Sequence, residues 1–196
     1  SNFGPNDADL FYGRSNFVDE LLKKISQNQN LTVITGASGS GKSSVVLAGL
    51  IPELAKQEKH QWIFSYFRPG HDPFFEFASA LSPLHEKYSN NPKILAKQLQ
   101  ENTVEIDEIL DDITKYSPDK KILFVVDQLG HLLTHSEEIC IEFLKLLYKA
   151  IEHSNEDDKK IFWVITIEGT NLENSIFLSI KEIHNQFKQN AITLYS

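Results

Sequence analysis

The feature that most constrains this chain is an eight-residue run, GASGSGKS, at residues 36–43. It fits the pattern Gly-x-x-x-x-Gly-Lys-Ser, in which glycines let the backbone turn tightly and approach an anion closely. Successive N–H groups then point inward at the start of a helix, where the helix dipole favours negative charge. The run follows an apolar segment, LTVIT, and precedes a helical one, SVVLAGL. This order predicts a phosphate-binding loop rather than an ordinary glycine-rich turn.

In such a loop the lysine reaches the β and γ phosphates of a nucleoside triphosphate, and the hydroxyl that follows binds Mg²⁺. Lys42 and Ser43 hold these two positions. We therefore expect nucleotide contacts from the loop and the first helical turn, namely Gly36, Ala37, Ser38, Gly39, Ser40, Gly41, Lys42, Ser43 and Ser44. The predicted cofactors are ATP (or ADP) and Mg²⁺, since no Asn-Lys-x-Asp motif for guanine is present.

A second acidic strand is expected to complete the metal site. The segment ILFVVD at residues 122–127 has five apolar residues followed by a carboxylate. Asp127 is therefore the predicted partner of Ser43 on Mg²⁺, with a carboxylate that merely ends a strand as the alternative.

Five short apolar runs, rich in β-branched residues, alternate with helical patterns. They lie at residues 31–35, 62–67, 122–126, 161–167 and 191–194. Continuous apolar runs between helices are typical of parallel strands covered on both faces, and so of an α/β fold. We expect a P-loop NTPase three-layer sandwich whose five-stranded parallel sheet has the order 5-1-4-3-2. That order brings residues 166–170 near the γ-phosphate, and residues 1–196 form one domain.

The helical patterns carry several local expectations. They cover residues 16–26, 42–50, 72–88, 91–100, 103–116, 136–153 and 171–189. Pro52 is expected to end or kink the second helix, and Ser136 to cap the sixth. Acidic residues between positions 101 and 112 alternate with apolar ones, which predicts a solvated helix face. Residues 117–120 and 155–160 are expected to form loops.

The composition indicates which classes of partner and which cellular compartment to expect. The formal net charge of −8 argues against a broad nucleic-acid-binding face, and no apolar run approaches the roughly 20 residues of a membrane span. Cys140 has no second cysteine to pair with, so a buried thiol and a reducing, cytoplasmic location are expected. Because methionine is absent even at position 1, we expect a fragment of a longer protein.

Four segments together resemble the novel STAND NTPases, which are signal-transduction ATPases related to the NACHT and AP-ATPase groups. They are FYGR at residues 11–14, TGASGSGKSSVVLAGLIPEL at 35–54, RPGHDP at 68–73 and VVDQ at 125–128. The resemblance implies an ATP-binding switch whose nucleotide state controls self-association or attached effector and sensor domains. The helical lid and sensor regions are expected beyond residue 196.

The resemblance also bears on residues outside the phosphate loop. It implies contacts with the base or ribose from Phe11, Tyr12, Gly13 and Arg14, although packing of the first helix explains Phe11 and Tyr12 equally well. It gives no role to residues 68–73, where a buried structural Arg68 is expected.

Three positions depart from the family pattern. The family carries acids where this chain has Gly130 and His131, and an arginine where it has Glu168. Because these positions are expected to activate water and sense the γ-phosphate, the resemblance implies binding with slow or impaired hydrolysis. Two alternatives remain: an active Mg-dependent ATPase that uses Gln128 or His131 to position water, and a scaffold with a vestigial pocket. His131 and His135 have metal-ligand spacing, but without an evident third ligand we expect them to be solvated or packed.

Overall fold

The computed structural model describes residues 5–57, 61–156 and 160–195, with side chains from residue 13 onward. Its sheet has five parallel strands in the order β2-β3-β4-β1-β5, which confirms the predicted order 5-1-4-3-2 as seen from the opposite edge. The strands are β1 (Leu31–Gly36), β2 (Gln61–Phe67), β3 (Lys120–Val126), β4 (Ile161–Glu168) and β5 (Ala191–Thr193). Each lies within two residues of its predicted bounds.

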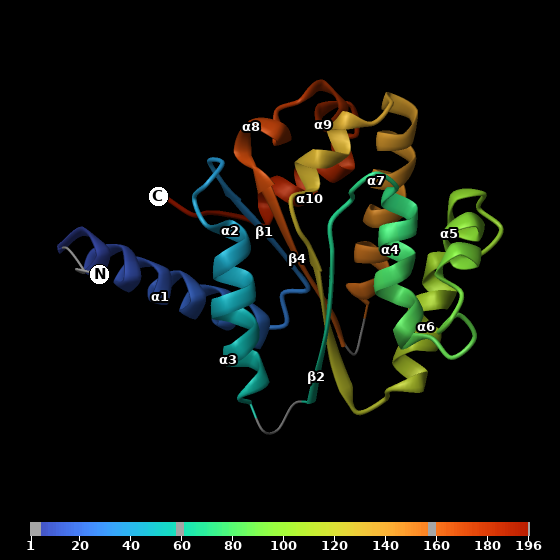
Figure 1. The fold of residues 1–196 in the computed structure, drawn as a ribbon, viewed down its shortest axis with the longest axis horizontal. Coiled ribbons are helices and arrows are strands. Elements are labelled where there is room, and N and C mark those ends of the chain that lie inside the picture. The colour runs from blue at the N-terminus through green and yellow to red at the C-terminus, as the bar shows by residue number, and fades with distance from the viewer. Residues whose placement is uncertain (1–4, 58–60, 157–159, 196) are drawn as a thin grey trace.

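Helices cover both faces of the sheet and give the expected three layers (Figure 1). One layer consists of α1 (Pro5–Ser26), α2 (Lys42–Ser44), the π-helix η1 (Val45–Leu50) and α3 (Ile51–Ala55). The opposite layer contains α4 (Pro73–Leu81), η2 (Ser82–Leu84), α5 (Pro92–Gln100), α6 (Ile106–Tyr116), η3 (Leu129–Thr134), α7 (Glu137–Ser154), α8 (Gly169–Leu172), α9 (Ser175–Ser179) and α10 (Lys181–Gln189).

Alternating side chains of the central strands supply two separate hydrophobic clusters. On β3, Phe124 packs into the larger cluster beneath α4 and α7, whereas Val125 packs into the smaller one beneath α1 and η1. Both side chains are at most 1% exposed. The continuous apolar runs in the sequence therefore reflect strands that are buried on both faces.

Two helix predictions on the first layer were wrong at their ends. The helix α1 begins at Pro5 rather than at residue 16, because the preceding segment, which includes Gly13, has no clear apolar period to reveal it. The helical backbone also continues through Pro52 to Ala55. Pro52 lies in the first turn of α3, after a wider π-helical turn in which Ile51 N donates to Val46 O, and that position does not need the missing N–H of proline.

On the second layer, two long predicted helices are divided. The helix α4 ends at Leu81 and passes into η2, which contains Pro83. The predicted helix at residues 171–189 is three helices, because the Asn174 side chain accepts from Ile176 N at 2.9 Å and starts a new one. The helices α5 and α7 follow their predictions closely, and the predicted cap is confirmed, since Ser136 Oγ accepts from Ile139 N.

The acidic face of α6 is exposed as predicted, and it also binds α7. His153 Nε2 lies 2.7 Å from Asp111 Oδ1, its Nδ1 lies 3.7 Å from Asp107 Oδ2, and Lys149 pairs with Glu105. The helix starts at Ile106, three residues later than predicted.

The remaining sequence predictions concern Cys140, two loops and membrane spans. Cys140 is fully buried as predicted, and burial raises the pKa of its thiol. Of the predicted loops, β3 already begins at Lys120, and residues 157–159 lie outside the described ranges. Within those ranges no helix is both long enough and apolar enough to span a bilayer.

Candidate functional site

The phosphate loop connects β1 to α2 and depends on left-handed glycines. Gly39 has φ 77° and Gly41 has φ 89°, values that residues with a Cβ rarely adopt. Gly41 is also the residue that precedes the first turn of α2, so the loop N–H groups lie at the positive end of a helical segment. The local geometry is the one that the glycine spacing predicts.

Lys42 folds back onto this loop. Its Nζ donates to Ala37 O at 2.8 Å and to Gly36 O at 3.2 Å, and lies 3.5 Å from Ser40 Oγ. Only 8% of the residue is exposed. Because charge-assisted bonds to phosphate oxygens are stronger than bonds to neutral carbonyls, the same ammonium can exchange these acceptors for a phosphate.

Ser43 and Asp127 come together at the carboxyl ends of β1 and β3. Ser43 Oγ donates to Asp127 Oδ1 at 2.8 Å, and Thr166 Oγ1, at the end of β4, donates to the same oxygen at 2.5 Å. Tyr66 Oη donates to Asp127 Oδ2 at 2.6 Å. Burial by itself raises the pKa of a carboxyl group, but these three hydroxyl donors outweigh it and hold the pKa of Asp127 below its usual value.

The residues Tyr66 and Arg68 were missed as parts of this cluster. Arg68 Nε donates to Tyr66 Oη at 2.6 Å and lies 3.4 Å from Asp127 Oδ2. The expectation of a buried Arg68 was wrong, since half of its side chain is exposed. It follows β2, which is an edge strand, so its surroundings are open on one side.

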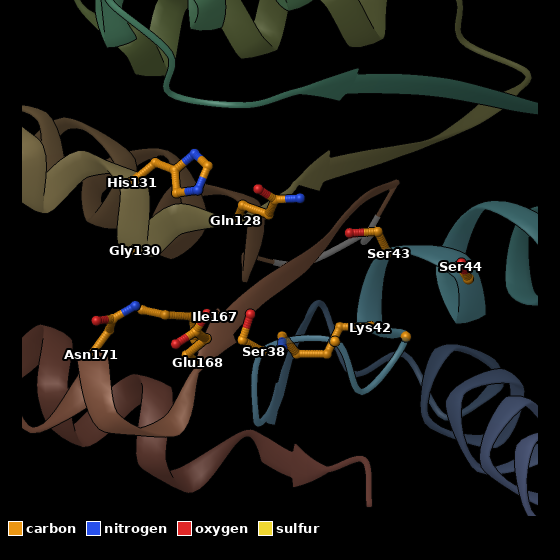
Figure 2. Close-up of a pocket in the computed structure, with 12 residues that line it drawn as sticks. Ser38, Lys42, Ser43, Ser44, Gln128, Gly130, His131, Ile167, Glu168 and Asn171 are labelled. Atoms are coloured by element: carbon orange, nitrogen blue, oxygen red, sulfur yellow. The ribbon is translucent and has the colours of Figure 1, made fainter. Parts of the chain in front are cut away.

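A cavity of about 270 Å³ opens beside these residues. Figure 2 shows Lys42 and Ser43 reaching it from the phosphate loop and α2, and Gln128 and His131 from the segment after β3. Glu168 reaches it from the end of β4, and Asn171 from α8. The complete lining is Ser38, Gly39, Gly41, Lys42, Ser43, Ser44, Gln128, Gly130, His131, Ile167, Glu168 and Asn171. All of these residues come from three sequence segments that the parallel sheet brings to one edge.

The residues expected on the base and ribose side are placed only in part. Arg14 Nη2 lies 3.4 Å from Ser40 O, so the N-terminal helix does contact the phosphate loop. Gly13 is exposed on the same helix, and the side chains of Phe11 and Tyr12 lie outside the described residues. A second hollow, of about 570 Å³, shares Ser38 and Glu168 with the first and extends along β1 and β5. No motif in the sequence predicted that hollow.

The donor set fits Mg²⁺ bound together with a nucleotide. In the described ranges no three His, Cys, Asp or Glu side chains converge as a metal site. The Ser43 hydroxyl and the Asp127 carboxylate lie within 2.8 Å of each other and are oxygen donors of the kind that Mg²⁺ prefers, and Mg²⁺ in proteins commonly takes its other ligands from phosphates and water. His131 and His135 do not form a metal pair: His135 Nε2 lies 2.7 Å from Gly70 O, whereas His131 is exposed at the cavity.

Comparison with known proteins identifies the family of the chain. The model of the family described as Novel STAND NTPase 1 matches residues 1–194. The chain belongs to this family. It is thus a nucleotide-binding NTPase module of the STAND type, as the four sequence segments indicated. No curated protein matches it in sequence.

Solved structures share the fold of this STAND domain. Two structures of the ORC2 protein of Aeropyrum pernix, described as ADPNP-ADP complexes and as an ADP form, superpose with a TM-score of 0.58 at 14% identity. Each match covers 93% of this chain, and 46% and 47% of the respective ORC2 chains. The STAND domain therefore spans about half the length of these structural relatives, and the likeness concerns the P-loop NTPase fold.

The three positions at which the resemblance implied other residues, Gly130, His131 and Glu168, all line the cavity. Gly36 of β1 pairs with Glu168 of β4, and this register sets the Glu168 carboxylate beside the start of the phosphate loop. Gly130 faces Asn171, whose Nδ2 occupies the space that a Cβ at position 130 would take. The chain thus has an amide and an imidazole on the wall where the resemblance implied acids, and an acid where it implied an arginine.

Proposed function

We propose that this STAND domain is an ATP-binding switch module that hydrolyses its nucleotide slowly or not at all. The phosphates lie along Gly36, Ala37, Ser38, Gly39, Ser40, Gly41, Lys42, Ser43 and Ser44. Mg²⁺ is held by Ser43 and Asp127. The observation that carries the proposal is the convergence of Lys42, Ser43 and the fully buried Asp127 beside one open cavity. A buried carboxylate with a lowered pKa is ionised at neutral pH and suited to a metal.

Weak hydrolysis is supported by the charges on the cavity wall. In-line attack on a γ-phosphate needs an oriented water molecule and a cation that balances developing negative charge. The cavity offers Glu168 where a cation is needed, and a carboxylate at this position repels a phosphate. Neither Gly130 nor Asn171, which covers it, can accept the proton of water as a carboxylate does.

Two observations favour a second candidate, an active Mg-dependent ATPase. Gln128 and His131 both line the cavity, so either could position the attacking water. The main chain of Gln128 is fixed, because its N–H donates to Thr166 Oγ1 at 2.8 Å while its φ is 53°. A third candidate, a scaffold with a vestigial pocket, predicts that nucleotide does not bind.

The coupling of nucleotide state to self-association, or to effector and sensor domains in a longer protein, is proposed from family membership alone. The chain has a fold that can bind and release a nucleotide, and a switch needs differential affinity for two states.

Calorimetry with Mg-ATP, Mg-ADP and Mg-GTP tests the proposal directly. We expect binding of the adenine nucleotides, weaker binding of Mg-GTP, and a loss of more than about tenfold in Lys42→Ala, because a charged contact contributes about 1.5–3 kcal/mol. Circular dichroism checks that the variant is folded. Equal affinity in the parent and Lys42→Ala would contradict the phosphate-loop assignment, and no binding by either would favour the scaffold.

A further inference from the structure

Asp127 presents its two carboxylate oxygens to different partners. Oδ1 accepts from Ser43 and Thr166, on the side of the phosphate loop. Oδ2 accepts from Tyr66 and faces Arg68, on the side of the edge strand β2. The carboxylate that is proposed to serve Mg²⁺ therefore already has a cation of the chain on its other oxygen.

Tyr66 links the guanidinium to this carboxylate. Arg68 Nε donates to Tyr66 Oη at 2.6 Å, and that hydroxyl in turn donates to Asp127 Oδ2 at 2.6 Å. The arginine is not needed to satisfy a buried donor of its own, because half of its side chain is exposed. What it adds to the site is positive charge, 3.4 Å from an oxygen of a fully buried carboxylate.

We propose that Arg68, together with Tyr66, opposes Mg²⁺ at Asp127 and so sets how strongly the metal contributes to nucleotide binding. This inference rests on the proposed function. Two cations that bind the same carboxylate repel each other, and each weakens the attraction of the carboxylate for the other. Mg-nucleotide binding then weakens the hold of Asp127 on Arg68, and by linkage Arg68 weakens the binding of the metal by the same factor.

The segment after Arg68 is placed to carry this effect away from the pocket. Gly70 O lies 2.7 Å from His135 Nε2, and Asp72 caps α4 by accepting from Phe75 N. His135 directly follows η3, which carries Gly130 and His131 into the cavity wall. Residues 68–72 thus connect the Asp127 carboxylate with α4 and with the end of η3, on a largely exposed stretch of chain. On this proposal, the RPGHDP segment at residues 68–73 changes its contacts with α4 and η3 when the metal binds at Asp127.

A purely structural Arg68 predicts the opposite effect. If the guanidinium only orients Asp127 for the metal, its removal weakens metal-dependent binding. If it opposes the metal, its removal strengthens that binding. The sign of one measurement therefore separates the two roles.

The experiment compares ADP affinity in excess Mg²⁺ with ADP affinity in a metal chelator, and takes the ratio for each variant. For Arg68→Gln we expect the ratio to rise by about fivefold or more, which is the lower range of measured coupling between two sites. Arg68→Lys retains the positive charge, so its affinity ratio is expected to rise less than that of Arg68→Gln. Lys115→Gln is the matched control, since it removes an exposed positive charge at the opposite end of the sheet and should leave the ratio unchanged.

The dependence of the affinity ratio on ionic strength is a second readout. A purely structural role of Arg68 does not predict such a dependence. Because Arg68 is half exposed, the gain in Arg68→Gln should shrink as ionic strength rises. An unchanged or lower ratio in Arg68→Gln overturns the inference and leaves the proposed function intact. A higher ratio that arises only from weaker metal-free binding also overturns it, because Arg68 would then contact phosphate. Failure of the parent protein to bind ADP under both conditions defeats the proposed function, and the inference with it.

Discussion

Asp127 receives more hydrogen bonds than a carboxylate at a strand end requires. Because Asp127 directly follows a buried apolar strand, its place at the carboxyl end of the sheet, near Ser43, could be predicted from the sequence. Its partners Thr166, Tyr66 and Arg68 were not predicted, because they lie on β4 and β2 and meet Asp127 only through the register of the sheet. The placement of Lys42 and Ser43 at the cavity could be predicted because it depends on spacing within a single loop.

The pair Ser43 and Asp127 allows a test of the metal site at single residues. Ser43→Ala and Asp127→Asn should each lower the Mg²⁺ dependence of ATP binding, since both serve one ion. Combined, they should be less than additive, because residues that share a partner couple. The measurement is ATP affinity against Mg²⁺ concentration for the four members of the cycle. Full additivity, with unchanged Mg²⁺ dependence, would remove Asp127 from the site.

Among the elements, α6 and α7 are joined by a titrating contact that the apolar pattern did not reveal. Burial by itself lowers the pKa of His153, but the hydrogen bond that the ring donates to Asp111 and the charges of Asp107, Asp111 and Glu156 outweigh it and raise the pKa above its ordinary value. A raised pKa in the folded state means that the contact stabilises fully below the unfolded value of about 6.5 and is lost as pH rises through the folded value.

His153→Gln tests this contact. Urea unfolding at pH values from about 6 to 8 should show the parent losing stability relative to the variant as pH rises, because the variant lacks the His153 proton and keeps the other histidines. His71→Gln, which removes a histidine from an exposed loop, is the control. Parallel pH profiles for the parent and His153→Gln would contradict the assigned contact.

A second test at this scale concerns η3 and α8, which face each other across the cavity. The triple variant Gly130→Glu, His131→Glu and Glu168→Arg should raise ATP turnover, because a restored general base typically contributes about 10²–10⁴-fold. The glutamate at position 130 must first displace the Asn171 amide. Adding Asn171→Ala should therefore increase the gain further. Phosphate release at saturating Mg-ATP is the measurement, and a quadruple variant no faster than the parent would contradict the assigned cause of weak hydrolysis.

For the molecule as a whole, the sequence predicted the class, the parallel sheet and its strand order. Long apolar runs on β1, β3 and β4 and the phosphate-loop motif were sufficient for that. Helix ends were less predictable, since Pro52 is accommodated by a π-helical turn and Asn174 starts a new helix by a side-chain bond. Single residues of the cavity wall could be predicted from the sequence, but the shape of the wall could not. That shape depends on how η3 and α8 approach each other.

We propose that this fold retains nucleotide while its cavity wall does not promote hydrolysis. The most direct test is to incubate the parent protein with ATP labelled on the γ-phosphate and on the base, in the presence of Mg²⁺, and to identify the nucleotide that stays bound. We predict bound ATP, with phosphate release near the rate without protein, and little bound nucleotide in Lys42→Ala. Rapid release of many equivalents of phosphate that disappears in Lys42→Ala would contradict the proposed slow hydrolysis and favour an ATPase that uses Gln128 or His131.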